Sequence, residues 1–282
     1  LTTAAPGMNS NERSGQAINL AKMIEKSRPR LYADPAFRFA LASAHRQHAQ
    51  PRNAEKLMTA LQAAGLDESW TACAIAEQWL ARPSPATPKK VLTCVTASGR
   101  PRLDGKLNDP MWQLTKSVTL QSSRKDDAEW PAVVVTAFDK EFLYIGASCR
   151  KPKGAAYTAD ASPRTHDADL SAHDRVEICL DIDRDYGSYW KLAVDSRGFT
   201  ADSCFGDSTW NPTWYVASGG DDQYWTFEAA VPLAELAPVA PKGRDAWSIG
   251  IQRIIPNIGQ QSFTQPASIP ERGETFGLLV FE

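Results

Sequence analysis

Three aspartates at alternate positions form the sharpest acidic cluster in the sequence. Asp181, Asp183 and Asp185 are followed by Gly187. Alternating oxygen ligands before a glycine turn are typical of calcium loops, because calcium prefers several hard oxygen ligands. The EF-hand pattern does not fit, since Leu192 stands where a bidentate glutamate is required. The three aspartates predict either a calcium site or a solvated hairpin bend.

Aromatic residues are the second chemical feature of the chain. It has nine tryptophans, and seven of them follow residue 90. Indole rings stack on the C–H faces of sugars, while sugar hydroxyls pair with carboxylate, amide and guanidinium groups. Trp210 and Trp214 flank a proline in the stretch STWNPTWY, so we expect them to face solvent more freely than the other tryptophans. An exposed aromatic patch of this kind often marks an interaction site.

A predicted β-hairpin connects the acidic and aromatic features. Residues 174–183 alternate in polarity, which places apolar side chains on one face and Glu177 with the acids on the other. Residues 184–187 provide polar, turn-forming side chains and a glycine. A second alternating strand follows at 188–195, and Arg197 stands in the turn after it. The hairpin therefore presents a polar face that could bind a ligand.

The rest of the chain after residue 90 also consists of short segments of alternating polarity separated by turns. The predicted strands are 91–97, 133–139, 142–149, 176–183, 188–195, 199–204, 224–231, 247–254 and 276–281. No long amphipathic helix lies between them, which indicates an antiparallel β-sandwich over 91–282. The fold class we predict is an all-β jelly-roll or β-sandwich domain preceded by a small all-α domain.

The first part of the chain differs from the rest. Residues 1–13 are polar and predict a disordered tail, whereas 14–82 repeat apolar residues at helical spacing. The short helix pairs resemble a tetratricopeptide-like array through their small-residue and leucine spacing. The Pro-rich stretch 83–90 is the predicted linker.

Composition excludes several classes of function. The formal net charge is −2 and no Lys/Arg run interleaves with aromatics, so a nucleic-acid partner is not expected. No window approaches the ~18 apolar residues of a membrane span. The five cysteines form no CxxC pair, and we find no nucleophile elbow, HExxH, phosphate loop or dinucleotide fingerprint. We therefore expect a non-catalytic protein, and without an initiator Met or signal peptide it reads as a piece of a larger parent chain.

Five segments in order resemble the family 9 carbohydrate-binding modules, which belong to the wider DOMON-like β-sandwich group. They are LDGKLNDPMW (103–112), AFDKEFLYIGASC (137–149), DRVEICLDID (174–183), YWTFEAAVPLAEL (224–236) and FGLLVF (276–281). Together they cover nearly all of 91–282. The resemblance implies a jelly roll with structural calcium that holds a terminal sugar between two tryptophans, backed by acidic, amide and basic side chains.

Carried over by position, the resemblance assigns a ligand set. Glu177 matches the family's glutamate after the DRV motif, and Arg197 matches a basic residue after the next strand. Residues 169–172 and Phe263 occupy the positions of the two stacking tryptophans. With the two tryptophans of the STWNPTWY stretch and Arg253 added, the expected ligand-binding residues are Glu177, Arg197, Trp210, Trp214, Arg253 and Phe263.

The expected function is binding of a terminal mono- or oligosaccharide by a module of a secreted, periplasmic or cell-surface bacterial protein. The module could serve polysaccharide degradation as an accessory of a glycoside hydrolase, in a carbohydrate catabolic process. One alternative is a structural or protein-interaction sandwich without a sugar site. Another is a haem-binding DOMON-like domain, although neither an axial ligand pair nor an attachment motif is evident.

Overall fold

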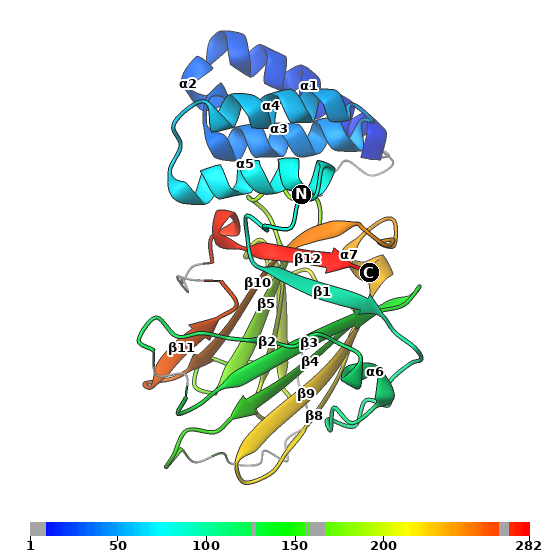
Figure 1. Ribbon diagram of the computed structural model, residues 1–282, viewed down its shortest axis with the longest axis vertical. Helices are drawn as coiled ribbons and strands as arrows, with labels where there is room; N and C mark the ends of the chain where they lie inside the picture. The colour runs from blue at the N-terminus through cyan, green and yellow to red at the C-terminus, as the bar shows by residue number, and fades with distance from the viewer. Residues whose placement is uncertain (1–9, 126–127, 156, 158–166, 265–270) are drawn as a thin grey trace. The chain divides into compact units, whose positions relative to one another are not determined.

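The computed structural model describes residues 10–125, 128–155, 157, 167–264 and 271–282. The chain forms two compact units, each drawn in Figure 1. The helical unit comprises Leu1–Lys89, Asp183–Ser188 and Arg272–Glu274, and the sandwich unit comprises Lys90–Ile182, Tyr189–Glu271 and Thr275–Glu282. The predicted tail 1–13 lies outside the described residues up to residue 9, and from Ser10 onward the chain is helical.

From Ser10 onward, where the structure describes the chain, five helices build the helical unit. They are α1 (Ser10–Ser27), α2 (Pro29–Tyr32), α3 (Pro35–Gln47), α4 (Pro51–Gln62) and α5 (Glu68–Ala81). Asp34 caps α3 by accepting a hydrogen bond from the Ala36 amide at 2.9 Å, and Asp67 caps α5 in the same way. Helices α2, α3 and α4 each begin with a proline. At this first position the helix makes no hydrogen bond to the residue's amide, so the missing amide hydrogen of proline costs nothing.

A buried carboxylate fixes the turn 183–188 within the helical unit. Glu77 on α5 pairs with Arg46 at 3.0 Å and with Arg184 at 2.8 Å, and the Tyr186 hydroxyl donates to it at 3.0 Å. Burial alone would raise the pKa of Glu77. The two guanidinium groups outweigh this effect and hold the pKa of Glu77 below its usual value. The Tyr186 ring packs edge-on against Phe39 at 5.0 Å in the same small core.

In the described residues, twelve strands build the sandwich unit, together with short helical turns. The strands are β1 (Val91–Thr96), β2 (Val118–Thr119), β3 (Ala132–Phe138), β4 (Phe142–Arg150), β5 (Arg175–Asp181), β6 (Trp190–Asp195), β7 (Thr200–Cys204), β8 (Tyr215–Gly220), β9 (Tyr224–Pro232), β10 (Ala246–Ile255), β11 (Gly259–Ser262) and β12 (Gly277–Phe281). The turns in this unit are α6 (Pro110–Gln113) and α7 (Leu233–Leu236), while the 3-10 helix η1 (Gly273–Thr275) has its first two residues in the helical unit. All nine predicted strands are present, and β2, β8 and β11 are additional.

The strands follow one another in the order β7-β6-β5-β10-β12-β1-β3-β4-β9-β8, with β11 beside β10 and β2 beside β3. Strand β1 connects the two layers, because its first half pairs with β12 and its second half with β3. Both of these pairings are parallel, which corrects the expectation of a purely antiparallel sandwich. A β-sandwich with a small helical N-terminal part is confirmed.

The core of the sandwich lies between the two layers. Strand β5 contributes Val176, Ile178 and Leu180, and β6 contributes Leu192 and Val194. Because successive side chains on a strand point to opposite faces, the residues between them face outward. In the described part of the chain, no helix is long and apolar enough to span a membrane.

Candidate functional site

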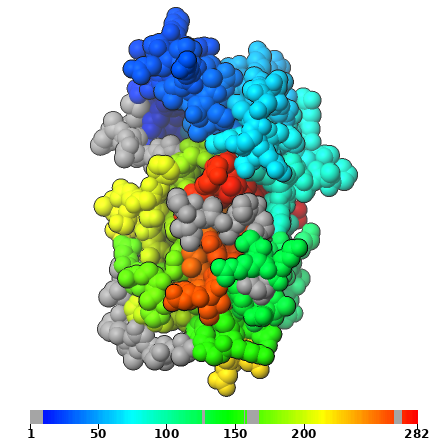
Figure 2. Space-filling view, turned by 90° about the vertical axis from the view of Figure 1, so that its left-hand side faces the viewer, coloured from blue at the N-terminus to red at the C-terminus, as the bar shows by residue number. Residues whose placement is uncertain are grey.

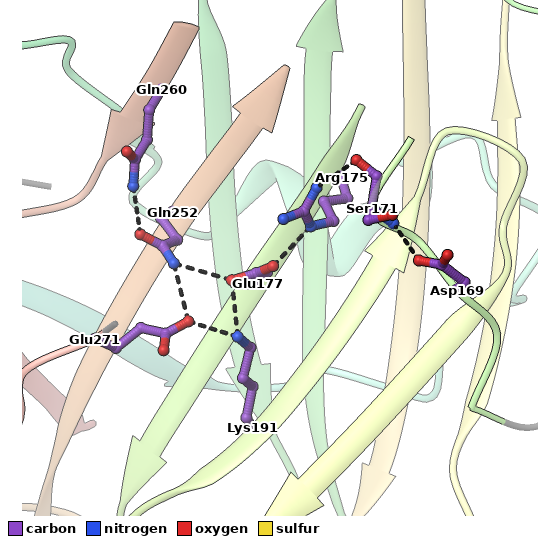
Figure 3. Close-up of polar contacts among 8 residues, drawn as sticks. All are labelled: Asp169, Ser171, Arg175, Glu177, Lys191, Gln252, Gln260 and Glu271. Atoms are coloured by element: carbon purple, nitrogen blue, oxygen red, sulfur yellow. Dashed lines mark hydrogen bonds and ion pairs between the residues drawn. The ribbon is translucent and has the colours of Figure 1, made fainter. Parts of the chain in front are cut away.

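The outward face of β5, β6, β10 and β11 carries a connected set of polar side chains, called here the Glu177 cluster. Its members are Arg175, Glu177, Lys191, Gln252, Gln260 and Glu271. Strand pairing brings them together, because Glu177 lies opposite Gln252 on one side and Ala193 on the other. Figure 3 shows the side chains of the cluster with the hydrogen bonds and ion pairs among them, and the orange surface in Figure 2 belongs to β10 and β11.

Short hydrogen bonds hold the centre of the cluster. The Lys191 ammonium lies 2.9 Å from Oε2 of Glu177 and 2.5 Å from Oε1 of Glu271. The Gln252 amide donates to the same two carboxylates, at 2.9 Å in each case. Gln260 in turn donates to the Gln252 oxygen at 2.7 Å. Each of these side chains is thereby bound to at least one other member of the cluster.

The cluster is mostly buried and electrically balanced. Two carboxylates, Glu177 and Glu271, face two cations, Lys191 and Arg175, so its four charges cancel. Only 7% of the Glu177 side chain is exposed, and this burial alone would raise the pKa of its carboxyl. The Lys191 charge and the hydrogen bond from Arg175 outweigh burial and lower the pKa of Glu177 to about 2.

The partners also determine what the cluster can do chemically. Although burial alone lowers the pKa of Lys191, the charge of Glu177 and the hydrogen bond to Glu271 raise it well above its usual value. A pKa far from neutrality makes a poor general acid or base. The arrangement suits hydrogen bonding to a ligand rather than proton transfer.

The two positions assigned to stacking tryptophans hold buried residues. Leu170 packs against Ala193 and Phe199 in a small cluster of its own. Phe263 is 2% exposed and belongs to the main core, where its ring leaves room for no side chain at Gly277. This corrects the expectation that Phe263 supplies a stacking surface, because neither face of its ring is open to solvent.

The tryptophans of the 210–214 loop lie on the core side of the sheet. Both are half-buried and pack against the main core. Trp210 lies against the Trp190 ring at 4.4 Å between centroids, and the Trp214 indole donates to Asp202 at 3.0 Å. Trp190 and Asp202 alternate with the outward residues of β6 and β7, so this loop is placed away from the Glu177 cluster.

The two predicted arginines are both engaged elsewhere. Arg197 binds Asp195 at 2.7 Å and lies over the Phe199 ring at 4.4 Å. Arg253 is 0% exposed and donates to Asp174 at 2.9 and 2.6 Å. Because Arg253 neighbours Gln252 along β10, its side chain points to the opposite face and lies in the core. The expectation that Arg253 binds ligand is corrected: it is half of a buried ion pair.

The three aspartates lie along one continuous stretch of chain. Asp181 ends β5 in the sandwich unit, whereas Asp183 and Asp185 belong to the turn 183–188 of the helical unit. Asp185 also accepts hydrogen bonds from the Gly187 and Ser188 amides, both at 2.8 Å. Burial and the neighbouring Asp183 charge raise the pKa of Asp185. The donor chemistry fits a calcium ion, which remains a proposal.

Several residues of the cluster are absent from the sequence-based set. Lys191 stands between Trp190 and Leu192, so the alternation of β6 already places it on the outward face. Gln252 stands between two inward residues of β10 in the same way. Glu271 lies outside any strand, and only the tertiary structure brings it to Lys191.

Comparison with known proteins supports the fold. No protein-family model matches the sequence, and no curated protein matches it. Among solved structures, a family 9 carbohydrate-binding module from Caldicellulosiruptor kristjanssonii in complex with cellotriose aligns with a TM-score of 0.54 and 17% identity, covering 68% of this chain and 94% of the module. A family 9 module from the same organism in complex with glucose aligns with a TM-score of 0.52 and 16% identity, covering 67% of this chain and 95% of the module.

A protein from Bacteroides uniformis aligns with a TM-score of 0.51 and 12% identity, covering 69% of this chain and all of that one. These structures share one architecture with the sandwich unit, which therefore has a fold like that of the family 9 modules. The tetratricopeptide-like character of the helices remains a prediction.

Proposed function

We propose that the sandwich unit binds carbohydrate, without catalysis, through the Glu177 cluster. The observation that carries the proposal is the connected set of carboxylate, amide and ammonium groups on one outward sheet face. A sugar hydroxyl donates one hydrogen bond and accepts others, so it can pair with Glu177 and Lys191 at once. Solved structures of the same fold hold glucose and cellotriose, which supports this class of ligand.

The pre-formed hydrogen bonds of the cluster favour recognition of a hydroxylated ligand. Hydroxyls arriving at the cluster exchange bonds with charged partners, each worth roughly 1.5–3 kcal/mol. Part of this free energy is lost again, because the arriving hydroxyls weaken the ion pairs already present in the cluster. We therefore expect weak binding, with a dissociation constant on the order of millimolar, near −4 kcal/mol.

The wider setting is part of the proposal. We place the module in a longer extracytoplasmic protein linked to polysaccharide degradation, where it would hold the chain near its substrate. A calcium ion at Asp181, Asp183 and Asp185 would serve structure only, since carboxylate oxygens suit it.

A second candidate is a structural or protein-interaction sandwich. It is favoured by Leu170, because this buried side chain lies where the family resemblance expects a stacking tryptophan. The two candidates differ in whether any saccharide binds to the intact chain.

Isothermal calorimetry of the full chain with glucose, cellobiose and cellotriose tests the proposal. We expect heat of binding in the wild type, a loss of at least tenfold in affinity in Glu177→Gln, and a smaller loss in Gln260→Ala at the edge of the cluster. Tyr215→Phe on β8, in the other sheet, is the matched control. Thermal melting of each variant separates loss of binding from loss of folding. Absence of binding to every saccharide leaves the interaction module as the better account.

A further inference from the structure

A row of aromatic side chains adjoins the Glu177 cluster on the same face of the sheet. The rings of Phe276 and Tyr189 meet at 5.4 Å between centroids, and those of Tyr189 and Phe205 at 6.2 Å. Exposure rises along this row: Phe276 is buried, Tyr189 is half-buried, and Phe205 is 64% exposed. The row therefore ends in a phenyl ring that is open to solvent and supported from one side.

Strand pairing joins this aromatic row to the polar cluster. Tyr189 directly precedes β6, two residues before the outward-facing Lys191, and its ring lies against Phe276. The Tyr189 hydroxyl lies 3.5 Å from the backbone oxygen of Glu271, the residue whose carboxylate binds Lys191. The Phe205 amide donates to the Tyr189 carbonyl at 2.9 Å, which places Phe205 directly beside it. Aromatic and polar groups thus form one continuous surface.

The two-residue turn between Cys204 and Asp207 sets a positive φ at position 205, but neither this turn nor packing requires a phenylalanine there. The backbone φ of Phe205 is +49°, in the left-handed region that bulky residues rarely adopt. An exposed phenyl ring also gives up the stability that burial would provide. Two unfavourable features at one residue point to a role outside the stability of the fold.

The spacing of the two surfaces sets the size of the ligand. Phe205 lies one strand interval and two residues from Lys191, about 8 Å, whereas three intervals and four residues separate it from Gln252, about 20 Å in all. A pyranose ring is about as wide as one interval. A single sugar cannot contact both Phe205 and Gln252, whereas a short oligosaccharide can.

We infer that Phe205, supported by Tyr189, is a stacking subsite for a second sugar ring of a neutral oligosaccharide. This inference rests on the proposed function of the Glu177 cluster, which would hold the adjacent ring. The flat phenyl face suits the C–H face of a pyranose, and the balanced charges of the cluster favour an uncharged sugar. An exposed ring at the end of the row is free to accept such a contact.

Calorimetry with neutral trisaccharides and their matching monosaccharides tests this inference on the full chain. The pairs are cellotriose with glucose, xylotriose with xylose and mannotriose with mannose. We expect Phe205→Ala to weaken trisaccharide binding roughly three- to tenfold and to change monosaccharide binding less than twofold. Phe205→Trp should restore or tighten trisaccharide binding. Tyr215→Ala, at a tyrosine 51% exposed in the other sheet, is the matched control and should change neither.

The outcomes separate the two proposals. Equal affinities of wild type and Phe205→Ala for every trisaccharide overturn the stacking subsite, while binding that still depends on Glu177 leaves the proposed function standing. Equal losses for mono- and trisaccharides also overturn it, because they place Phe205 in the first sugar site or in the fold. If no saccharide binds to the wild type, the proposed function fails and the subsite fails with it.

Discussion

Replacing Glu177 with glutamine should remove a large, acid-sensitive part of the stability of the sandwich unit. The carboxyl has an ordinary pKa of 4.5, and although burial opposes the shift, Lys191 and Arg175 lower it to about 2 in the folded chain. At about 1.4 kcal/mol per pKa unit, the ionised form contributes about 3 kcal/mol to folding at neutral pH. Because the folded-state pKa is the lower one, this contribution is complete above pH ~5 and disappears as the pH falls toward 2.

Urea unfolding between pH 6 and pH 3 measures this contribution. Wild type should lose about 2 kcal/mol more than Glu177→Gln over that range, since the variant has no carboxyl to titrate. The control is Glu141→Gln, at a side chain 64% exposed and paired with Arg100, which should follow wild type within about 0.5 kcal/mol. Carbon-13 NMR of the Glu177 carboxyl gives the pKa directly. Parallel stability profiles, or a carboxyl that titrates near 4.5, would refute the reasoning.

Three further predictions concern the ion pair, the acidic cluster and the linker. Arg253→Met should destabilise the sandwich by roughly 3–5 kcal/mol because it leaves Asp174 buried without its cation; a loss below 1 kcal/mol in thermal unfolding would contradict the pair's importance. Calcium should raise the melting temperature of wild type and not of Asp185→Asn, whereas identical midpoints with calcium and with chelator would make the cluster a solvated bend. Limited proteolysis should cut within 83–90 and release a folded fragment beginning near Val91; a resistant core that includes both halves of the chain would oppose that division.

The strands of this fold could be predicted where side-chain alternation is strong. The hairpin of β5 and β6 is an example, since Val176 and Ile178 on one face and Glu177 on the other fix both the strand and its register. Strand β11 was missed because its sequence GQQS is polar on both faces, and β8 because it ends in two glycines. The parallel pairing of β1 with β12 joins the two ends of the domain, and local patterns do not contain such a contact.

The site was predictable only in part. Glu177 follows from the alternation of β5, and the same argument applied to β6 and β10 would have added Lys191 and Gln252 and removed Arg253, which lies one position away on the inward face. Glu271 lies in a loop, so no local sequence pattern predicts its contact with Lys191. Phe205 was missed because a single phenylalanine after a short strand has no periodic signal, although its exposure in the structure is plain.

The most direct test of the account is a crystal structure of the chain soaked with cellotriose. We predict a sugar ring on the outward face of β5, β6 and β10, with hydroxyls within hydrogen-bonding distance of Glu177 and Gln252. Calorimetry in the soaking buffer gives the dissociation constant, and the cellotriose concentration of the soak should exceed it. A cellotriose bound on another face, or bound in solution yet making no contact with Glu177, would contradict the assignment of this cluster as the carbohydrate site.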